Sequence, residues 1–244
     1  MTDSDAAEPQ ALLAAATCVL FDFDGPMCGL FHGHPAAGVA AELRAWAARA
    51  VPRVPADLMA TWRSVDDPHA ILSEAARRLP GSDLVGELEE LLTSQESTAT
   101  ETAAATQGAD QLIRRLSAAG IRLAVTTNNS ASAVSLYLAR VGLTEFFGKH
   151  VHGRMRDPRL LKPNPHCLIR ALETTGSTAT ESLMIGDSVA DYEAAAQLKV
   201  PFLGYARSPR KRDLLSKAGA KAIVASMSEL VPVLDGAEPG LRVE

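Results

Sequence analysis

The fold is decided by the stretch CVLFDFDG at residues 18–25, an apolar run that ends in two carboxylates and a glycine. Such a run predicts a buried strand that delivers acids to its own carboxyl end. Because side chains alternate along a strand, Asp22 and Asp24 leave it on the same side. Gly25 then lets the backbone turn sharply. Since burying unpaired charge is costly, the two acids need a cation, a shared proton or water.

Length and composition allow one sizeable core with a smaller second unit. The chain has 244 residues, 47% of them hydrophobic, and a net charge of −5, whereas nucleic-acid-binding surfaces are normally basic. No apolar stretch approaches a membrane span, and no Lys or Arg precedes Arg44, so a signal peptide is not expected. The three cysteines show no paired spacing, which argues against disulfides and zinc. We therefore expect a cytoplasmic protein without nucleic-acid or membrane partners, in an oligomeric state that the sequence leaves open.

The chain divides into three kinds of sequence. Residues 1–15 predict a flexible, acidic tail with room for one helical turn. From about 31 to 105 apolar residues recur at helical spacing between proline breaks, which predicts a cap of about four helices. After Gly108 helices alternate with short apolar strands, a pattern typical of a parallel sheet covered on both faces. We expect an α/β fold, with a Rossmann-like core formed by residues 16–30 and 106–244 and an all-helical cap inserted over 31–105.

Three further strand ends carry polar side chains. Residues 127–130, TNNS, suit an anion or cap the helix that follows. Lys162 precedes Pro163 and is either a fixed point charge or a surface-loop residue. Asp187 follows a strand, and Asp191 lies four residues later on the same helix face. Because ligands bind at the carboxyl ends of such sheets, we expect these groups to converge on a site for Mg²⁺ and a phosphate.

The ordered motifs resemble those of the haloacid dehalogenase-like superfamily, in the type with a helical cap inserted after the first motif. The resemblance covers residues from about 16 to 235. It rests on DFDG at 22–25, Thr127-Asn128, Lys162-Pro163 and GDSVAD at 186–191. It implies Mg²⁺-dependent hydrolysis of a phosphomonoester, a small phosphorylated metabolite, through an aspartyl-phosphate.

The resemblance also implies a role for each motif residue. Asp22 would be the nucleophile, and Asp24 would protonate the leaving group and then activate water. Thr127, helped by the backbone of Asn128, would hold the phosphoryl group, and Lys162 would bridge nucleophile and phosphate.

The same resemblance implies a metal site. Mg²⁺ would be held by Asp22, the main-chain carbonyl of Asp24 and Asp187. Asp191 would support Lys162 or a metal-bound water. The supporting residues are then Gly25, Ser188 and Asp191.

Several alternatives stay open at this level. Pro26 stands where the family usually has Thr, which predicts an altered loop geometry without loss of activity. Asp24 argues against dehalogenation, which in this family proceeds without it, and the absence of any lysine before Lys149 argues against Schiff-base phosphonate hydrolysis. A sugar-phosphate mutase uses the same four motifs, and a non-catalytic binding module on the same fold is the third reading.

Two groups of polar residues lie beside the expected site. Arg154, Arg156 and Arg159 form either a solvated surface run or a cluster that draws anionic substrates toward the site. His32 and His34 lead into the cap as linker residues, with substrate contact as the alternative.

Overall fold

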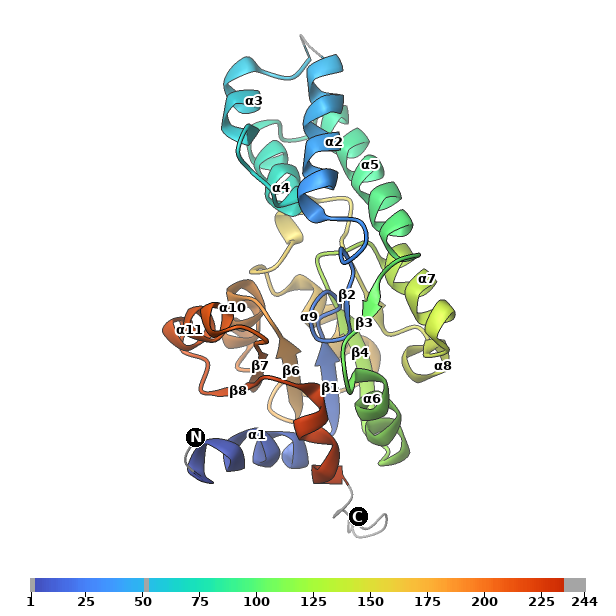
Figure 1. The fold of residues 1–244 in the computed structure, drawn as a ribbon, viewed down its shortest axis with the longest axis vertical. Coiled ribbons are helices and arrows are strands. Elements are labelled where there is room, and N and C mark those ends of the chain that lie inside the picture. The colour runs from blue at the N-terminus through green and yellow to red at the C-terminus, as the bar shows by residue number, and fades with distance from the viewer. Residues whose placement is uncertain (1–2, 51–52, 235–244) are drawn as a thin grey trace.

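Six parallel strands form the central sheet, in the order β5-β4-β1-β6-β7-β8. The computed structural model describes residues 3–50 and 53–234 (Figure 1). Its strands confirm the predicted α/β fold with a Rossmann-like parallel sheet. They are β1 (Cys18–Phe21), β4 (Arg122–Thr126), β5 (Val151–His152), β6 (Ser182–Gly186), β7 (Phe202–Tyr205) and β8 (Ala222–Val224).

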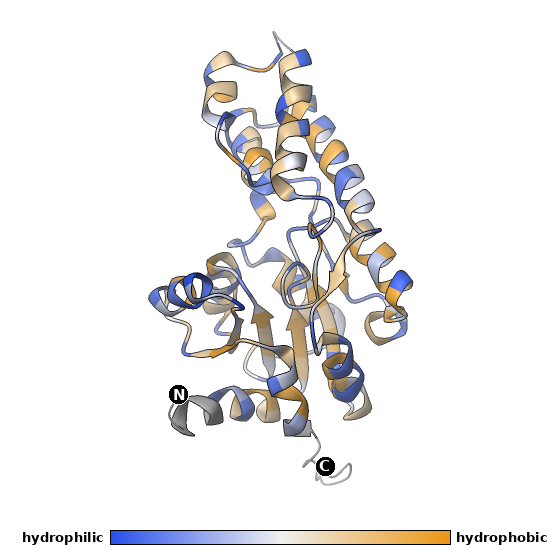
Figure 2. Cartoon of the chain, in the orientation of Figure 1, coloured by the Kyte–Doolittle hydropathy of each residue, from blue (hydrophilic) through white to orange (hydrophobic). Residues whose placement is uncertain are grey.

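Helices cover both faces of this sheet, which explains why its strands are predominantly apolar and buried (Figure 2). Val19 and Phe21 of β1 pack into one hydrophobic cluster, and Cys18 and Leu20 pack into a second cluster on the other face. The first face carries α6 (Ala109–Ala118), α7 (Ala131–Val141) and α8 (Thr144–Phe147), and the second carries α9 (His166–Thr175), α10 (Val189–Leu198) and α11 (Pro209–Ala218).

The prediction of a loose tail over residues 1–15 is wrong for the part that the structure describes. Asp3–Ala15 forms helix α1, whose Leu13 is fully buried in the first cluster. The 3-10 segment η2 (Met227–Leu234) packs beside it. The Ala- and Leu-rich composition of this segment favours a helix, and packing against the far end of the chain holds that helix on the core.

Four helices lie between the first two motifs, above the carboxyl ends of the strands (Figure 1). They are α2 (Ala36–Arg49), α3 (Ala56–Trp62), α4 (Pro68–Arg78) and α5 (Asp83–Ala99). They enclose a hydrophobic cluster of their own, around Trp62 and Leu58. A short antiparallel pair, β2 (Cys28–Gly29) and β3 (Ala104–Ala105), joins them to the sheet. Among the described helices, none combines the length and apolarity that crossing a bilayer requires.

His152, at the end of β5, couples the stability of the core to pH. Its imidazole is buried, with Nε2 2.8 Å from the Thr174 hydroxyl. Burial lowers the pKa of His152 from 6.5 to about 4, with smaller effects from Arg170 and His150. Because the unfolded chain takes up this proton first, we expect the free energy of unfolding to decrease as the pH falls from about 6.5 toward 4.

Denaturant unfolding at pH 7 and at pH 4.5 measures this effect. His152→Gln should reduce the difference in unfolding free energy between the two pH values. His150→Gln gives the comparison: burial lowers the pKa of His150 too, but His150 is only half-buried, so this substitution should reduce the difference less than His152→Gln does. An unchanged difference in His152→Gln would assign the pH dependence to other groups.

Candidate active site

The chain leaves three adjacent strands of the sheet at the same edge, beneath the four helices. In the register of the sheet Phe21 lies opposite both Val125 and Ile185. The backbone N–H of Asp22 donates to the Ile185 carbonyl at 2.9 Å, so the first carboxylate is fixed where the strand ends. The first, second and fourth motifs therefore converge, as the sequence predicts.

Lys162 is buried at the centre of this group and is not a surface-loop residue. Its Nζ lies 2.8 Å from Asp22 Oδ1 and 2.5 Å from Asp191 Oδ1, and it donates to the Thr126 carbonyl at 2.8 Å. Burial alone would lower the pKa of Lys162, but the charges of Asp191 and Asp22 raise it overall. Lys162 is therefore a fixed cation in contact with the candidate nucleophile.

Three buried carboxylates lie close together at this edge, and two of them, Asp22 and Asp191, contact the Lys162 ammonium group. Asp22, Asp187 and Asp191 each place one oxygen within 4.8 Å of the others. Burial raises the pKa of Asp22 and of Asp187, and the neighbouring charge of Asp191 adds to both shifts. Gly25 has a φ of +124°, and a Cβ there would overlap the Asp187 carboxylate, so only glycine fits.

Asp24 stands apart from the three carboxylates, toward the helical cap. Its Oδ1 accepts a hydrogen bond of 2.8 Å from the backbone N–H of Leu30. Burial raises the pKa of Asp24 to about 6, and the Leu30 hydrogen bond opposes the shift. A carboxyl group that titrates close to neutral pH is suited to general acid–base catalysis.

Asp191 both caps α10 and orients Lys162. Its Oδ2 accepts from the Ser188 N–H at 3.0 Å, the Ser188 hydroxyl at 2.7 Å and the Asp187 N–H at 3.1 Å. The Ser188 hydroxyl accepts in turn from the Asp191 N–H, which completes a capping box. The other Asp191 oxygen contacts Lys162, so one side chain has a structural and an electrostatic role.

The sequence of the loop after β4 suits either capping of the next helix or binding of an anion, and its residues differ in role. Ser130 caps α7, because its hydroxyl accepts from the Ala133 N–H. Asn128 instead binds the Lys162 backbone on both sides: its Oδ1 accepts from the Lys162 N–H at 2.7 Å, and its Nδ2 donates to the Lys162 carbonyl at 3.2 Å. Thr127 is buried beside this amide pair.

Arg154 does not belong to a solvated surface run and cannot draw substrates in from solvent. Its guanidinium group is fully buried and forms ion pairs with Glu89 and Glu96 of helix α5. Arg156 and Arg159 line a cavity of about 660 Å³ beneath the start of α5, which no motif residue lines. Arg159 pairs with Asp157 at 2.7 Å.

Two charged contacts of the site were missed in the sequence. Lys211, at the start of α11, contacts the Asp187 carboxylate. It follows β7, so a further strand end was the available signal. Glu96 falls on the buried face of α5 at the spacing of Leu88 and Leu92, and an acid on an apolar stripe was the signal there.

The histidines that lead into the cap differ in their surroundings. His34 Nε2 lies 2.7 Å from Oε1 of Gln95 on α5, and His32 is exposed. His34 therefore ties the linker to the cap helix, which favours the linker reading for this residue.

The donor set at the strand ends fits Mg²⁺. The three clustered side chains are carboxylates, the hard oxygen ligands that Mg²⁺ prefers. Two ammonium groups, of Lys162 and Lys211, lie against them. Three acids and two ammonium groups leave an excess of negative charge in a buried place, which a divalent cation would neutralise. Lys211 is half-exposed and can leave Asp187 without being pulled from the core.

A family model for haloacid dehalogenase-like hydrolases matches residues 16–199. The chain belongs to this family, which confirms the predicted family and the prediction of a hydrolytic enzyme.

Individual relatives agree with this assignment. A phosphoglycolate phosphatase of Rhodospirillum rubrum is 33% identical over 54% of this chain and 54% of its own length, so the match spans about half of that relative. A phosphoglycolate phosphatase of Pectobacterium atrosepticum is 24% identical over 92% of this chain and 94% of its own. A hydrolase of the family from Deinococcus radiodurans, solved with bound phosphate and sodium, superposes with a TM-score of 0.56 at 26% identity, over 89% of this chain and 94% of that one.

Proposed function

We propose that this protein is a Mg²⁺-dependent phosphomonoester hydrolase that acts on a small phosphorylated metabolite through an aspartyl-phosphate. The observation that carries the proposal is the contact of 2.8 Å between Lys162 Nζ and Asp22 Oδ1 at the carboxyl edge of the sheet. It joins a candidate nucleophile to a cation that can neutralise an incoming phosphate. The named relatives make a short phosphorylated carboxylic acid, such as phosphoglycolate, the first substrate to test.

The residues divide the reaction into two displacements. In the first, an Asp22 oxygen attacks phosphorus, the bond to the leaving oxygen breaks, and Asp24 gives its proton to that oxygen. In the second, the Asp24 carboxylate takes a proton from water, the water oxygen attacks phosphorus, and Asp22 leaves with release of inorganic phosphate. Thr127 and Lys162 would hold the phosphoryl oxygens throughout.

The acids also define where the cation would bind. Asp22, Asp187 and the Asp24 carbonyl would hold Mg²⁺, which supplies charge neutralisation to the transferring phosphoryl group when bound. Asp191 keeps its place on Lys162. The three cysteines are buried and unpaired, in agreement with the expected cytoplasmic location.

A panel of phosphate esters with Mg²⁺, scored by release of inorganic phosphate, tests this function. We expect release from at least one short phosphorylated acid or from p-nitrophenyl phosphate. Phosphorus NMR of the products separates hydrolysis from the mutase alternative, because a mutase converts a sugar phosphate into its isomer without net phosphate release. The absence of both reactions over the whole panel would favour the binding-module reading.

A further inference from the structure

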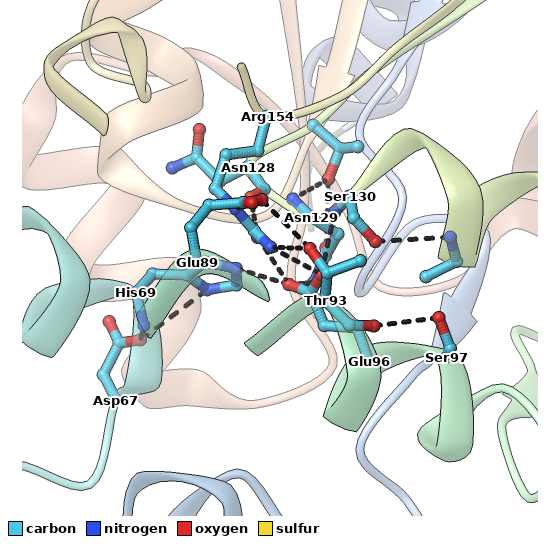
Figure 3. A network of polar contacts seen from close by, with 12 residues as sticks. Asp67, His69, Glu89, Thr93, Glu96, Ser97, Asn128, Asn129, Ser130 and Arg154 are labelled. Atoms are coloured by element: carbon cyan, nitrogen blue, oxygen red, sulfur yellow. Dashed lines mark hydrogen bonds and ion pairs between the residues drawn. The ribbon is translucent and has the colours of Figure 1, made fainter. Parts of the chain in front are cut away.

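A buried ion pair joins the helical cap to the core (Figure 3). Arg154 follows β5 of the core, and Glu96 lies on cap helix α5. Arg154 Nη1 lies 2.8 Å from Glu96 Oε1, and its Nη2 lies 3.1 Å from Glu96 Oε2. Neither side chain is exposed to solvent. His69 Nε2, on cap helix α4, lies 3.0 Å from the same Glu96 Oε1.

Both members of the pair also bind the loop that follows β4. Glu96 Oε1 accepts from Asn129 Nδ2 at 3.1 Å, and Glu96 Oε2 accepts from the Ser130 N–H at 2.9 Å. Arg154 Nη1 donates to the Asn128 carbonyl at 3.0 Å, and the Arg154 N–H donates to the Asn129 carbonyl at 2.8 Å. A carboxylate of the cap thus holds two consecutive residues of a core loop.

The loop residues so held are those that contact Thr127 and Lys162. The Thr127 hydroxyl donates to Asn129 Oδ1 at 3.0 Å and accepts from the Asn129 N–H at 3.1 Å. The Asn128 amide pairs with the Lys162 backbone on both sides. Two hydrogen bonds therefore lead from Glu96 through Asn129 to the Thr127 hydroxyl. The path from Glu96 to the Lys162 backbone is one step longer and runs through Arg154 and Asn128.

Stabilisation alone does not account for this arrangement. Burying an ion pair costs desolvation, and a well-packed apolar pair of similar volume would hold the cap at least as firmly. A hydrogen-bonded pair differs in fixing the orientation of the polar groups around it. Here those groups are the amide of Asn129 and the backbone of residues 128–130.

We propose that Glu96 and Arg154 are positioning residues, through which the helical cap sets the place of the Thr127 hydroxyl and of Lys162 in the phosphate site. The proposal rests on the proposed phosphatase function. It makes the cap a part of the catalytic apparatus of the core, in addition to any part it has in choosing the substrate.

A double-mutant cycle between Glu96→Gln and Thr127→Val tests this coupling. Gln keeps the shape of Glu96 but turns one acceptor oxygen into an NH₂ group that faces donors. Glu96→Gln should lower kcat/KM for the best ester of the panel by about tenfold or more. Added to Thr127→Val, it should lower kcat/KM by clearly less than it does in the wild type, because the part of its effect that passes through the Thr127 hydroxyl is then gone and only the part that passes through Lys162 is left.

The matched control is Glu89→Gln. Glu89 lies on the same helix and contacts the same arginine, at 3.1 Å from Arg154 Nε, but no hydrogen bond or ion pair joins it to residues 127–130 in the described part of the chain. Its effect on kcat/KM should stay within about twofold. Multiplicative losses in the Glu96→Gln cycle, or a lower melting temperature with unchanged kcat/KM well below it, would overturn the proposal.

Calorimetric titration with inorganic phosphate in the presence of Mg²⁺ separates this proposal from the proposed function. A wild-type protein that binds phosphate without hydrolysing any ester would refute the phosphatase function. The double-mutant cycle of Glu96→Gln and Thr127→Val, measured as the Kd for phosphate, would then still decide the role of Glu96. Non-additive losses of phosphate affinity support the positioning role, and additive losses refute it. A wild-type protein that neither binds phosphate nor hydrolyses an ester would refute both.

Discussion

Asp22→Asn is expected to abolish turnover, with a loss of at least about 10³-fold in kcat for phosphate release. The amide has nearly the shape of the carboxylate but cannot attack phosphorus as an anion. Lys162 keeps two partners in this variant, the Asp191 carboxylate and the Thr126 carbonyl. The substitution also removes the repulsion between the carboxylates of residues 22 and 191, which is one of the causes that raise the pKa of Asp22 in the wild type.

We therefore expect the fold to survive this substitution, with a melting temperature within about 5 °C of the wild type. Phosphate release and thermal unfolding measured on the same preparation separate lost chemistry from lost structure. Asp110→Asn is the control, because Asp110 is an exposed acid on α6, paired only with Arg114 among the described residues. Activity of Asp22→Asn within tenfold of the wild type would remove Asp22 as the nucleophile.

The core of the fold could be predicted from the sequence because its signals are local. Three of the four motifs, those that begin at Asp22, Thr127 and Gly186, lie at the end of an apolar strand, and parallel strands bring their carboxyl ends to one edge whatever the details of packing. The motif of Lys162 was expected at a strand end too, but it follows the 3-10 segment η1 (Pro158–Leu160) and not β5 directly.

The contact between Lys162 and Asp22 spans 140 positions in the sequence. The Asn128 amide binds the Lys162 backbone, and Asp191 and the Thr126 carbonyl bind its ammonium group, so groups at two strand ends hold Lys162 in the core although it lies in a loop.

The connection between cap and core could not be predicted in the same way. Arg154 and Glu96 are 58 positions apart and lie in different units. The place of Glu96 on the apolar face of α5 indicates a buried acid, but nothing in the sequence identifies Arg154 as its partner. Only their meeting removes both from water. Helix α1 was missed for a related reason, since the surface that buries Leu13 belongs to the core and in part to the last described segment of the chain.

This connection bears on whether the core can act without the cap. A core without residues 31–105 would keep Arg154 but lose Glu89 and Glu96, and its loop at 128–130 would lose the acceptors it binds. Removing one partner of a buried pair leaves a charge without compensation. Activity of the isolated core toward small esters would thus require that loop to hold its place unaided.

Removal of divalent cations is the second large effect expected. Dialysis against EDTA should lower phosphate release by about 100-fold or more, and Mg²⁺ should restore it. The reason is that three clustered carboxylates carry more negative charge than two ammonium groups offset; the acids are Asp22, Asp187 and Asp191, and the cations are Lys162 and Lys211.

Titration calorimetry with Mg²⁺ alone gives a readout independent of turnover, and Asp187→Asn should weaken the binding measured there. Lys211→Met should strengthen it, because an ammonium group then no longer contacts the Asp187 carboxylate. Full activity after exhaustive dialysis, together with no heat of Mg²⁺ binding, would assign the neutralisation of phosphate to the two lysines alone.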